Sequence, residues 1–231
     1  MRVDFIRINR SEWLIFRHTL RLVAFLPLLG ASAWGETINT GDDTYPVTVY
    51  TRFEQKHSQR LFETLRSEVA SIMAPVGLRF EWRSLEDPSH ALSSELVVVS
   101  FKGACRMDEL LLPHVDSGNL AWSYVNDGHL TPFSDVDCNL VREFINPAVI
   151  HGNWVDREAM LGRALGRVLA HELYHIFLDT KRHATGGVAK PFFTVHDLVE
   201  DHFNLQAKDA QALRGGRPHA TKRSKRLSVP D

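Results

Sequence analysis

Alternating apolar and polar positions predict several strands in the first part of the chain. β-Branched and aromatic residues are frequent in these stretches, and Gly, Pro and Asn residues stand between them. The predicted strands are residues 45–53, 78–82, 95–101, 120–125 and 129–136. The last two flank the turn Asn126-Asp127-Gly128 and form a hairpin. Pro132 lacks a backbone donor, so the second hairpin strand is expected at a sheet edge or at a bulge.

In three other stretches the apolar residues recur at the spacing of a helix. Residues 59–74 follow Ser58, a suitable cap, and stop at Pro75-Val76-Gly77. Residues 154–178 follow Asn153, a second suitable cap. The buried stripe of this second helix is expected to be Leu161, Leu165, Val168, Leu169, Leu173 and Ile176. A final helix is predicted over residues 195–213, before Gly215-Gly216.

Length and element order together indicate one α+β domain. The chain has 231 residues, of which 44% are hydrophobic, enough for one sizeable core. The order is strand, long helix, strands, hairpin, second helix, loop and last helix. We therefore predict a mixed twisted sheet within residues 34–214, with an N-terminal part to about residue 178 and a short C-terminal part over 179–214.

The first 33 residues have the features of a signal peptide. Five arginines precede a short apolar run at residues 22–29, and Ala31-Ser32-Ala33 fits a signal-peptidase site, so cleavage is expected after Ala33. The run is too short to span a bilayer, which needs about 20 residues. The alternative is an uncleaved anchor. We predict a secreted or periplasmic protein with no stable membrane insertion after cleavage.

Charge argues against a nucleic-acid partner. Removing residues 1–33 takes away five basic and two acidic residues, which leaves 22 Lys and Arg against 26 Asp and Glu. Residues 215–231 form a basic tail that is expected to be flexible and solvated, with attraction to an anionic envelope surface as the functional alternative. Cys105 and Cys138, an even pair in an exported chain, are predicted to form a disulfide.

The second predicted helix carries the motif His171-Glu172-Leu173-Tyr174-His175. Two histidines four residues apart lie on one helix face and can hold a zinc ion, while Glu172 can act on a water. Catalytic zinc takes three protein ligands, so a third ligand must come from elsewhere. His183, eight residues beyond the motif, is the preferred candidate, and Glu200 on the last predicted helix is the alternative.

The stretch from 171 to 191 resembles the metzincin zinc metalloproteases, in particular the matrixin-like ones. His171, Glu172 and His175 match the motif of that clan, and His183 would match its third histidine. Residues 187–191 fall where the clan has a tight turn containing methionine. The sequence departs from the pattern in having Leu178 where the clan has glycine and no methionine in that turn.

The resemblance implies a zincin-like fold with a backing helix, an active-site helix and a short C-terminal subdomain with one helix. It also implies a zinc endopeptidase that acts on a peptide or protein substrate, with His171, His175 and His183 as metal ligands and Glu172 as general base. The rival with Glu200 as third ligand would resemble thermolysin. Two other classes stay open: a zincin-fold protein that binds metal or peptide without turnover, and a zinc hydrolase of small molecules.

Overall fold

The computed structural model describes residues 1–4, 7–8, 44–87, 95–107 and 118–216. The predicted cleavage site after Ala33, the apolar run at 22–29 and the basic tail beyond residue 216 lie outside the described residues. Among the helices that are described, none is long and apolar enough to cross a membrane.

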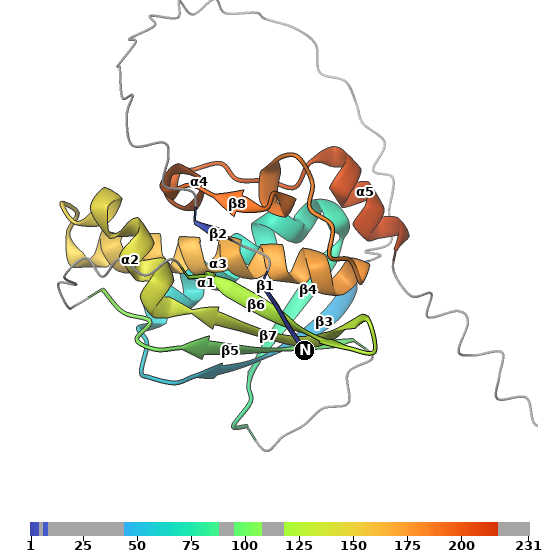
Figure 1. Ribbon diagram of the computed structural model, residues 1–231. Coiled ribbons are helices and arrows are strands. Elements are labelled where there is room, and N and C mark those ends of the chain that lie inside the picture. The colour runs from blue at the N-terminus through green and yellow to red at the C-terminus, as the bar shows by residue number, and fades with distance from the viewer. Residues whose placement is uncertain (5–6, 9–43, 88–94, 108–117, 217–231) are drawn as a thin grey trace, which may run out of the picture.

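The core of the fold is a mixed sheet of six strands in the order β1-β6-β7-β5-β3-β4 (Figure 1). The strands are β1 (Arg2–Asp4), β3 (Tyr45–Phe53), β4 (Leu78–Ser84), β5 (Leu96–Lys102), β6 (Ala121–Asn126) and β7 (His129–Asp137). Strands β4, β3, β5 and β7 run parallel, whereas β6 runs antiparallel to both of its neighbours. This arrangement confirms the prediction of an α+β fold with a mixed sheet.

All five strands predicted from alternation are present, with ends within about two residues. Strand β7 lies between β6 and β5, so the edge position considered for it is wrong. The alternative, a bulge, is confirmed: the register between β6 and β7 shifts between Ser123 and Val125, opposite Pro132. Pairing of β7 with β5 begins only at Phe133. The missing donor of Pro132 therefore falls where the ladder is already irregular.

Two long helices, α1 (Gln59–Met73) and α3 (Trp154–Leu178), lie side by side on one face of the sheet (Figure 1). Their caps are the predicted ones: the Ser58 side chain accepts from Leu61 N, and the Asn153 side chain accepts from Asp156 N. Two glycines of α3 allow the close approach. A Cβ on Gly162 would lie 2.4 Å from the carbonyl oxygen of Leu61, so only glycine fits there.

The prediction of one continuous helix over residues 195–213 is wrong. The chain forms α4 (Val195–Val199) and α5 (Ala207–Gly215), with extended backbone at Glu200 between them. The reason is a tertiary contact: the buried guanidinium of Arg167 on α3 donates to the carbonyl oxygens of Asp197 and Glu200. These carbonyls therefore have partners outside a helix, and the helix can end there.

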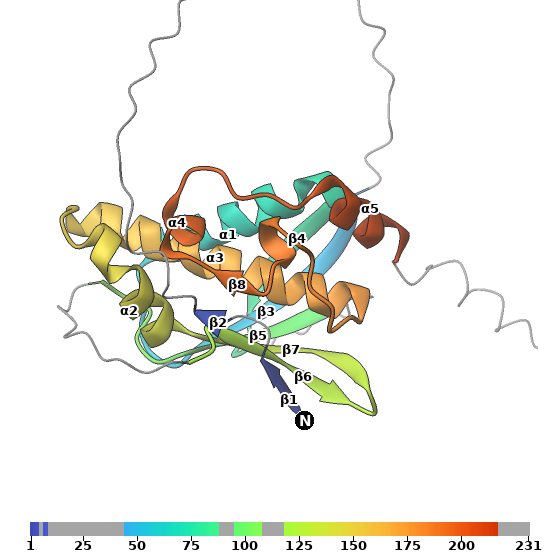
Figure 2. The same ribbon diagram turned by 45° about the horizontal axis from the view of Figure 1, so that its top comes forward.

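One helix was not predicted at all. Helix α2 (Cys138–Val149) follows β7 directly and begins at Asp137, whose side chain accepts from Leu140 N. The remaining elements are the 3-10 turns η1 (Ala74–Val76) and η2 (Gly187–Ala189) and the two-stranded pair β2 (Arg7–Ile8) and β8 (Phe192–Phe193). Together α4, α5, β8 and η2 cover the side of α3 that faces away from the sheet (Figure 2).

Cys105 and Cys138 are joined in a disulfide, with their Cα atoms 5.0 Å apart. The bond ties the segment after β5 to the first residue of α2. Both cysteines are buried in the core.

We expect the Cys105→Ala/Cys138→Ala double variant to be less stable than the wild type by about 3–4 kcal/mol, because the bond closes a loop of about 33 residues in the unfolded chain. Denaturant unfolding of both proteins measures the difference. Free-thiol titration of the denatured, unreduced wild type is the accompanying control. Two reactive thiols per chain would contradict the disulfide.

Candidate metal centre

The C-terminal half of α3 places two histidines side by side in the interior. His171 and His175 are one turn apart, and both are fully buried. Their Nε2 atoms lie 3.0 Å from each other, and their ring centroids are 4.6 Å apart. Two imidazole nitrogens at this separation can bind the same ion.

A third histidine reaches the same place from the loop after α3. The helix ends at Asp179, whose backbone adopts a left-handed conformation with φ of 45° and turns the chain back. The centroid of the His183 ring lies 5.3 Å from that of His171 and 4.8 Å from that of His175. One ring nitrogen from each of the three histidines lies within 4.8 Å of the others. Among the described residues, this is the group that can hold a metal ion.

Backbone carbonyls orient two of the rings. Nδ1 of His171 lies 2.6 Å from the carbonyl oxygen of Val188, and Nδ1 of His175 lies 2.7 Å from that of Thr180. A carbonyl can only accept, so each Nδ1 carries the proton and donates it. Each Nε2 is then left with its lone pair on the side where the rings converge, as metal ligation requires.

Burial keeps these rings neutral. Loss of hydration lowers the pKa of His171 well below its ordinary value, and a positive charge on His175 would lower it further. Loss of hydration likewise lowers the pKa of His175 to about 3. Neutral imidazole is the form that binds a metal ion, so the site is prepared for one at neutral pH.

Glu172 lies between the two helix histidines and is also fully buried. Its Oε2 atom accepts a hydrogen bond of 2.6 Å from the hydroxyl of Ser123 on β6. This contact links α3 to β6, the strand next to the edge strand β1. Ser123 could not be predicted from the sequence, because a serine in an apolar strand has no distinctive pattern.

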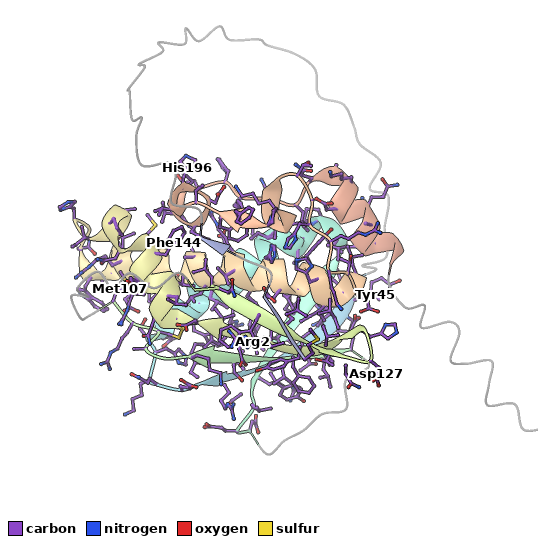
Figure 3. All side chains as sticks on the ribbon, in the orientation of Figure 1. Arg2, Tyr45, Met107, Asp127, Phe144 and His196 are labelled. Atoms are coloured by element: carbon purple, nitrogen blue, oxygen red, sulfur yellow. A yellow bond between two sulfur atoms is a disulfide. The ribbon has the colours of Figure 1, made fainter. Side chains whose placement is uncertain are left out.

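Glu200, the alternative third ligand, is not brought to this group. It follows the short helix α4, and its half-exposed side chain lies 3.4 Å from His196 of the same helix. Figure 3 shows His196 at the outer side of α4. The carbonyl oxygen of Glu200 accepts from Arg167, which fixes its backbone. His183 and Glu200 are thus distinguished by position, and His183 is the one beside the motif.

The segment compared with the methionine turn lies next to the histidines. Val188 and Ala189 in η2 are fully buried, and Val188 provides the carbonyl that accepts from His171. Ala184 donates to the carbonyl of Ala189 over 2.8 Å, which closes the loop that carries His183. This turn therefore supports the site through its backbone, which does not require a methionine side chain.

Asp179 also connects the end of α3 to the hairpin formed by β6 and β7. Its side chain accepts from Leu130 N over 2.7 Å and pairs with His129 Nδ1. The hydrogen bond between the two side chains raises the pKa of His129 and lowers that of Asp179. The pair therefore contributes stability from the ordinary pKa of Asp179 up to that of His129. The contribution is lost as the pH rises through the raised pKa of His129, or falls through the lowered pKa of Asp179.

We expect Asp179→Asn to lower the melting temperature at about pH 5–6, and to lower it less above about pH 8, where His129 is neutral in both proteins. Asparagine tolerates the left-handed backbone and can still accept from Leu130, so only the charge is removed. Melting curves from pH 5 to 9 at low salt measure the difference, because the pair is exposed and salt screens it. A difference that is constant with pH would contradict the pairing.

Comparisons of this chain with protein-family models, with curated proteins and with solved structures find no match.

Proposed function

We propose that this chain is a zinc-dependent peptidase. The observation that carries the proposal is the convergence of His171, His175 and His183 around a helix that also presents a buried glutamate, Glu172. Burial of ionisable side chains is costly in free energy and is frequent at functional sites, and here such side chains gather at one point.

The three histidines fit zinc by their chemistry. Zinc prefers imidazole nitrogen, and three protein ligands leave a fourth position for water in a catalytic site. Two of the rings are already oriented by carbonyl oxygens, at Val188 and Thr180, so little conformational freedom is lost on binding. A zinc ion held there would polarise a substrate carbonyl and acidify a water.

Glu172 is the proposed general base. A carboxylate beside the metal site can take a proton from the attacking water and pass it to the leaving amine. The hydrogen bond from Ser123 fixes the orientation of its carboxylate beside the proposed metal site. Because Ser123 stands on β6, the strand also sets the position of the base.

The architecture supports a zincin-like assignment in general terms. The mixed sheet, helix α1 beside helix α3, and the C-terminal part after residue 178 are consistent with the order that the resemblance implies. We propose that the chain acts outside the cytoplasm, where the disulfide between Cys105 and Cys138 would be maintained. A peptide or protein is the proposed substrate.

The test is hydrolysis of a fluorogenic peptide library by the protein, first stripped of metal and then supplied with one equivalent of zinc. We expect cleavage only with zinc and its loss again on addition of chelator. Zinc binding without cleavage of any peptide would instead favour a non-catalytic binding protein. Cleavage of small esters or amides alone would favour a hydrolase of small molecules.

A further inference from the structure

The N-terminal residues of the chain pair with β6, the strand that supplies Ser123. Strand β1 runs antiparallel to β6, with Arg2 opposite Tyr124 and Val3 opposite Ser123. Met1 and Val125 exchange two backbone hydrogen bonds, of 2.9 Å from Met1 N and 2.7 Å from Val125 N. The otherwise open edge of β6 is therefore covered by the chain itself.

A second pairing follows a few residues later. Strand β2 runs parallel to β8, with Arg7 opposite Phe192 and Ile8 opposite Phe193. Strand β8 belongs to the C-terminal part, whereas β6 belongs to the six-stranded sheet (Figure 1). The same short N-terminal stretch thus pairs with one strand from each part of the molecule.

In both pairings, a residue of the partner strand contacts the candidate metal centre. Ser123, opposite Val3, donates to Glu172 over 2.6 Å. Phe193, opposite Ile8, packs edge-on against His171, with ring centroids 5.4 Å apart. The paired residues on the body of the protein are therefore the direct neighbours of the proposed base and of a proposed ligand.

Side chains of β1 add to the backbone pairing. The guanidinium of Arg2 stacks on the ring of Trp122 at 3.3 Å from its centroid, and Figure 3 shows Arg2 beside β6. Val3 is half-buried and packs against the core. These contacts hold one particular register of an extended segment.

We propose that β6 and β8 form the two walls of a groove for an extended peptide, and that β1 and β2 occupy it and exclude a substrate. The inference rests on the proposed function, because it assigns this groove to the substrate of the same site. Strand addition to a sheet edge is a general way to bind an extended peptide. If a signal peptidase cleaves the chain after Ala33, the same cleavage removes β1 and β2 from the groove. Export would then also open the groove to a substrate.

The full chain with Val3→Pro tests the occupancy. Met1 and Val125 form a hydrogen-bonded pair, so Val3 and Ser123 form the next one along the antiparallel ladder. Proline removes the donor of Val3 from that ladder, whereas the control Val3→Ile keeps it together with the β-branched shape. Arg2→Ser is a second variant, which removes the stacking on Trp122 and leaves every backbone donor in place.

Two measurements are independent of catalysis. Amide hydrogen exchange at Val125 is expected to be about tenfold faster in Val3→Pro than in Val3→Ile, from loss of the pairing. A labelled synthetic peptide with the sequence of residues 1–8 is expected to bind Val3→Pro and to be excluded by Val3→Ile. Arg2→Ser should show the same two changes to a smaller extent.

Unchanged exchange at Val125 in both test variants, or equal peptide binding by all the chains, would overturn the proposal. Hydrolysis by the zinc-loaded proteins distinguishes the proposed peptidase function from the proposed groove and its occupant. Faster hydrolysis by Val3→Pro than by Val3→Ile is the result that supports both. Peptide binding by Val3→Pro with no zinc-dependent hydrolysis by any chain would contradict the proposed function and still support the groove and its occupant.

Discussion

Replacing Glu172 with glutamine is expected to reduce zinc-dependent peptide hydrolysis by about 10²–10⁴-fold, the usual contribution of a general base. The amide has nearly the shape of the carboxylate and can still accept from Ser123, so the packing around α3 should persist. It cannot take a proton from water at neutral pH. Zinc affinity should stay within a few-fold of the wild type, because the ligands proposed are the three histidines.

The measurement is kcat/KM on a cleaved peptide, together with the zinc dissociation constant of the same preparation. Glu200→Gln is the matched control, since it makes the same chemical change at a half-exposed position just after the short helix α4. It should leave both quantities near their wild-type values. Hydrolysis by Glu172→Gln at the wild-type rate would show that Glu172 is not the base.

Replacing His183 with alanine is expected to weaken zinc binding by more than about 100-fold. Loss of a partner outside the ligand set typically weakens metal binding 10–100-fold, and loss of a ligand should exceed that. His183 lies on a loop, so its removal leaves the buried pair on α3 in place. Competition with a chromophoric chelator gives the dissociation constants of wild type and variant.

Glu200→Ala and His196→Ala are the controls for this prediction. Both side chains lie on or next to α4 and pair with each other there. Neither change should alter zinc affinity by more than a few-fold. If instead Glu200→Ala released the metal and His183→Ala retained it, the ligand set would be the thermolysin-like one.

The parts of the fold that follow a local pattern could be predicted from the sequence. Helix α3 begins and ends at the predicted residues, because Asn153 caps it and an amphipathic stripe runs along it. The motif on that helix put His171 and His175 on one face by spacing alone. Strand β3 likewise has its predicted limits, since alternation and β-branched residues agree there.

The parts that depend on distant residues were missed. The break between α4 and α5 is stabilised by Arg167, about 30 residues earlier in the chain. No residue pattern near the break predicts it. Helix α2 carries Pro147 inside it, which argues against a helix when it is read locally. Its capping residue Asp137, with Val141 and Ile145 one turn apart, was the available signal.

The choice between two third ligands could not be made from spacing. Both His183 and Glu200 stand at separations from the motif that some zinc sites use. Their positions depend on how the chain turns after α3, which is set by the left-handed backbone at Asp179 and by the contact from Ala184 to Ala189. The pairing of β1 and β2 was not predicted either, because the composition of the first residues is typical of a leader.

The central claim, a single zinc ion held by three histidines with one position open, is tested most directly by X-ray absorption at the zinc edge. The sample is the wild-type chain loaded with one equivalent of zinc. We expect one tightly bound ion with three imidazole nitrogens at about 2.0–2.1 Å and one further oxygen from solvent. Failure to bind zinc stoichiometrically, or a coordination shell with fewer than three imidazoles, would contradict it.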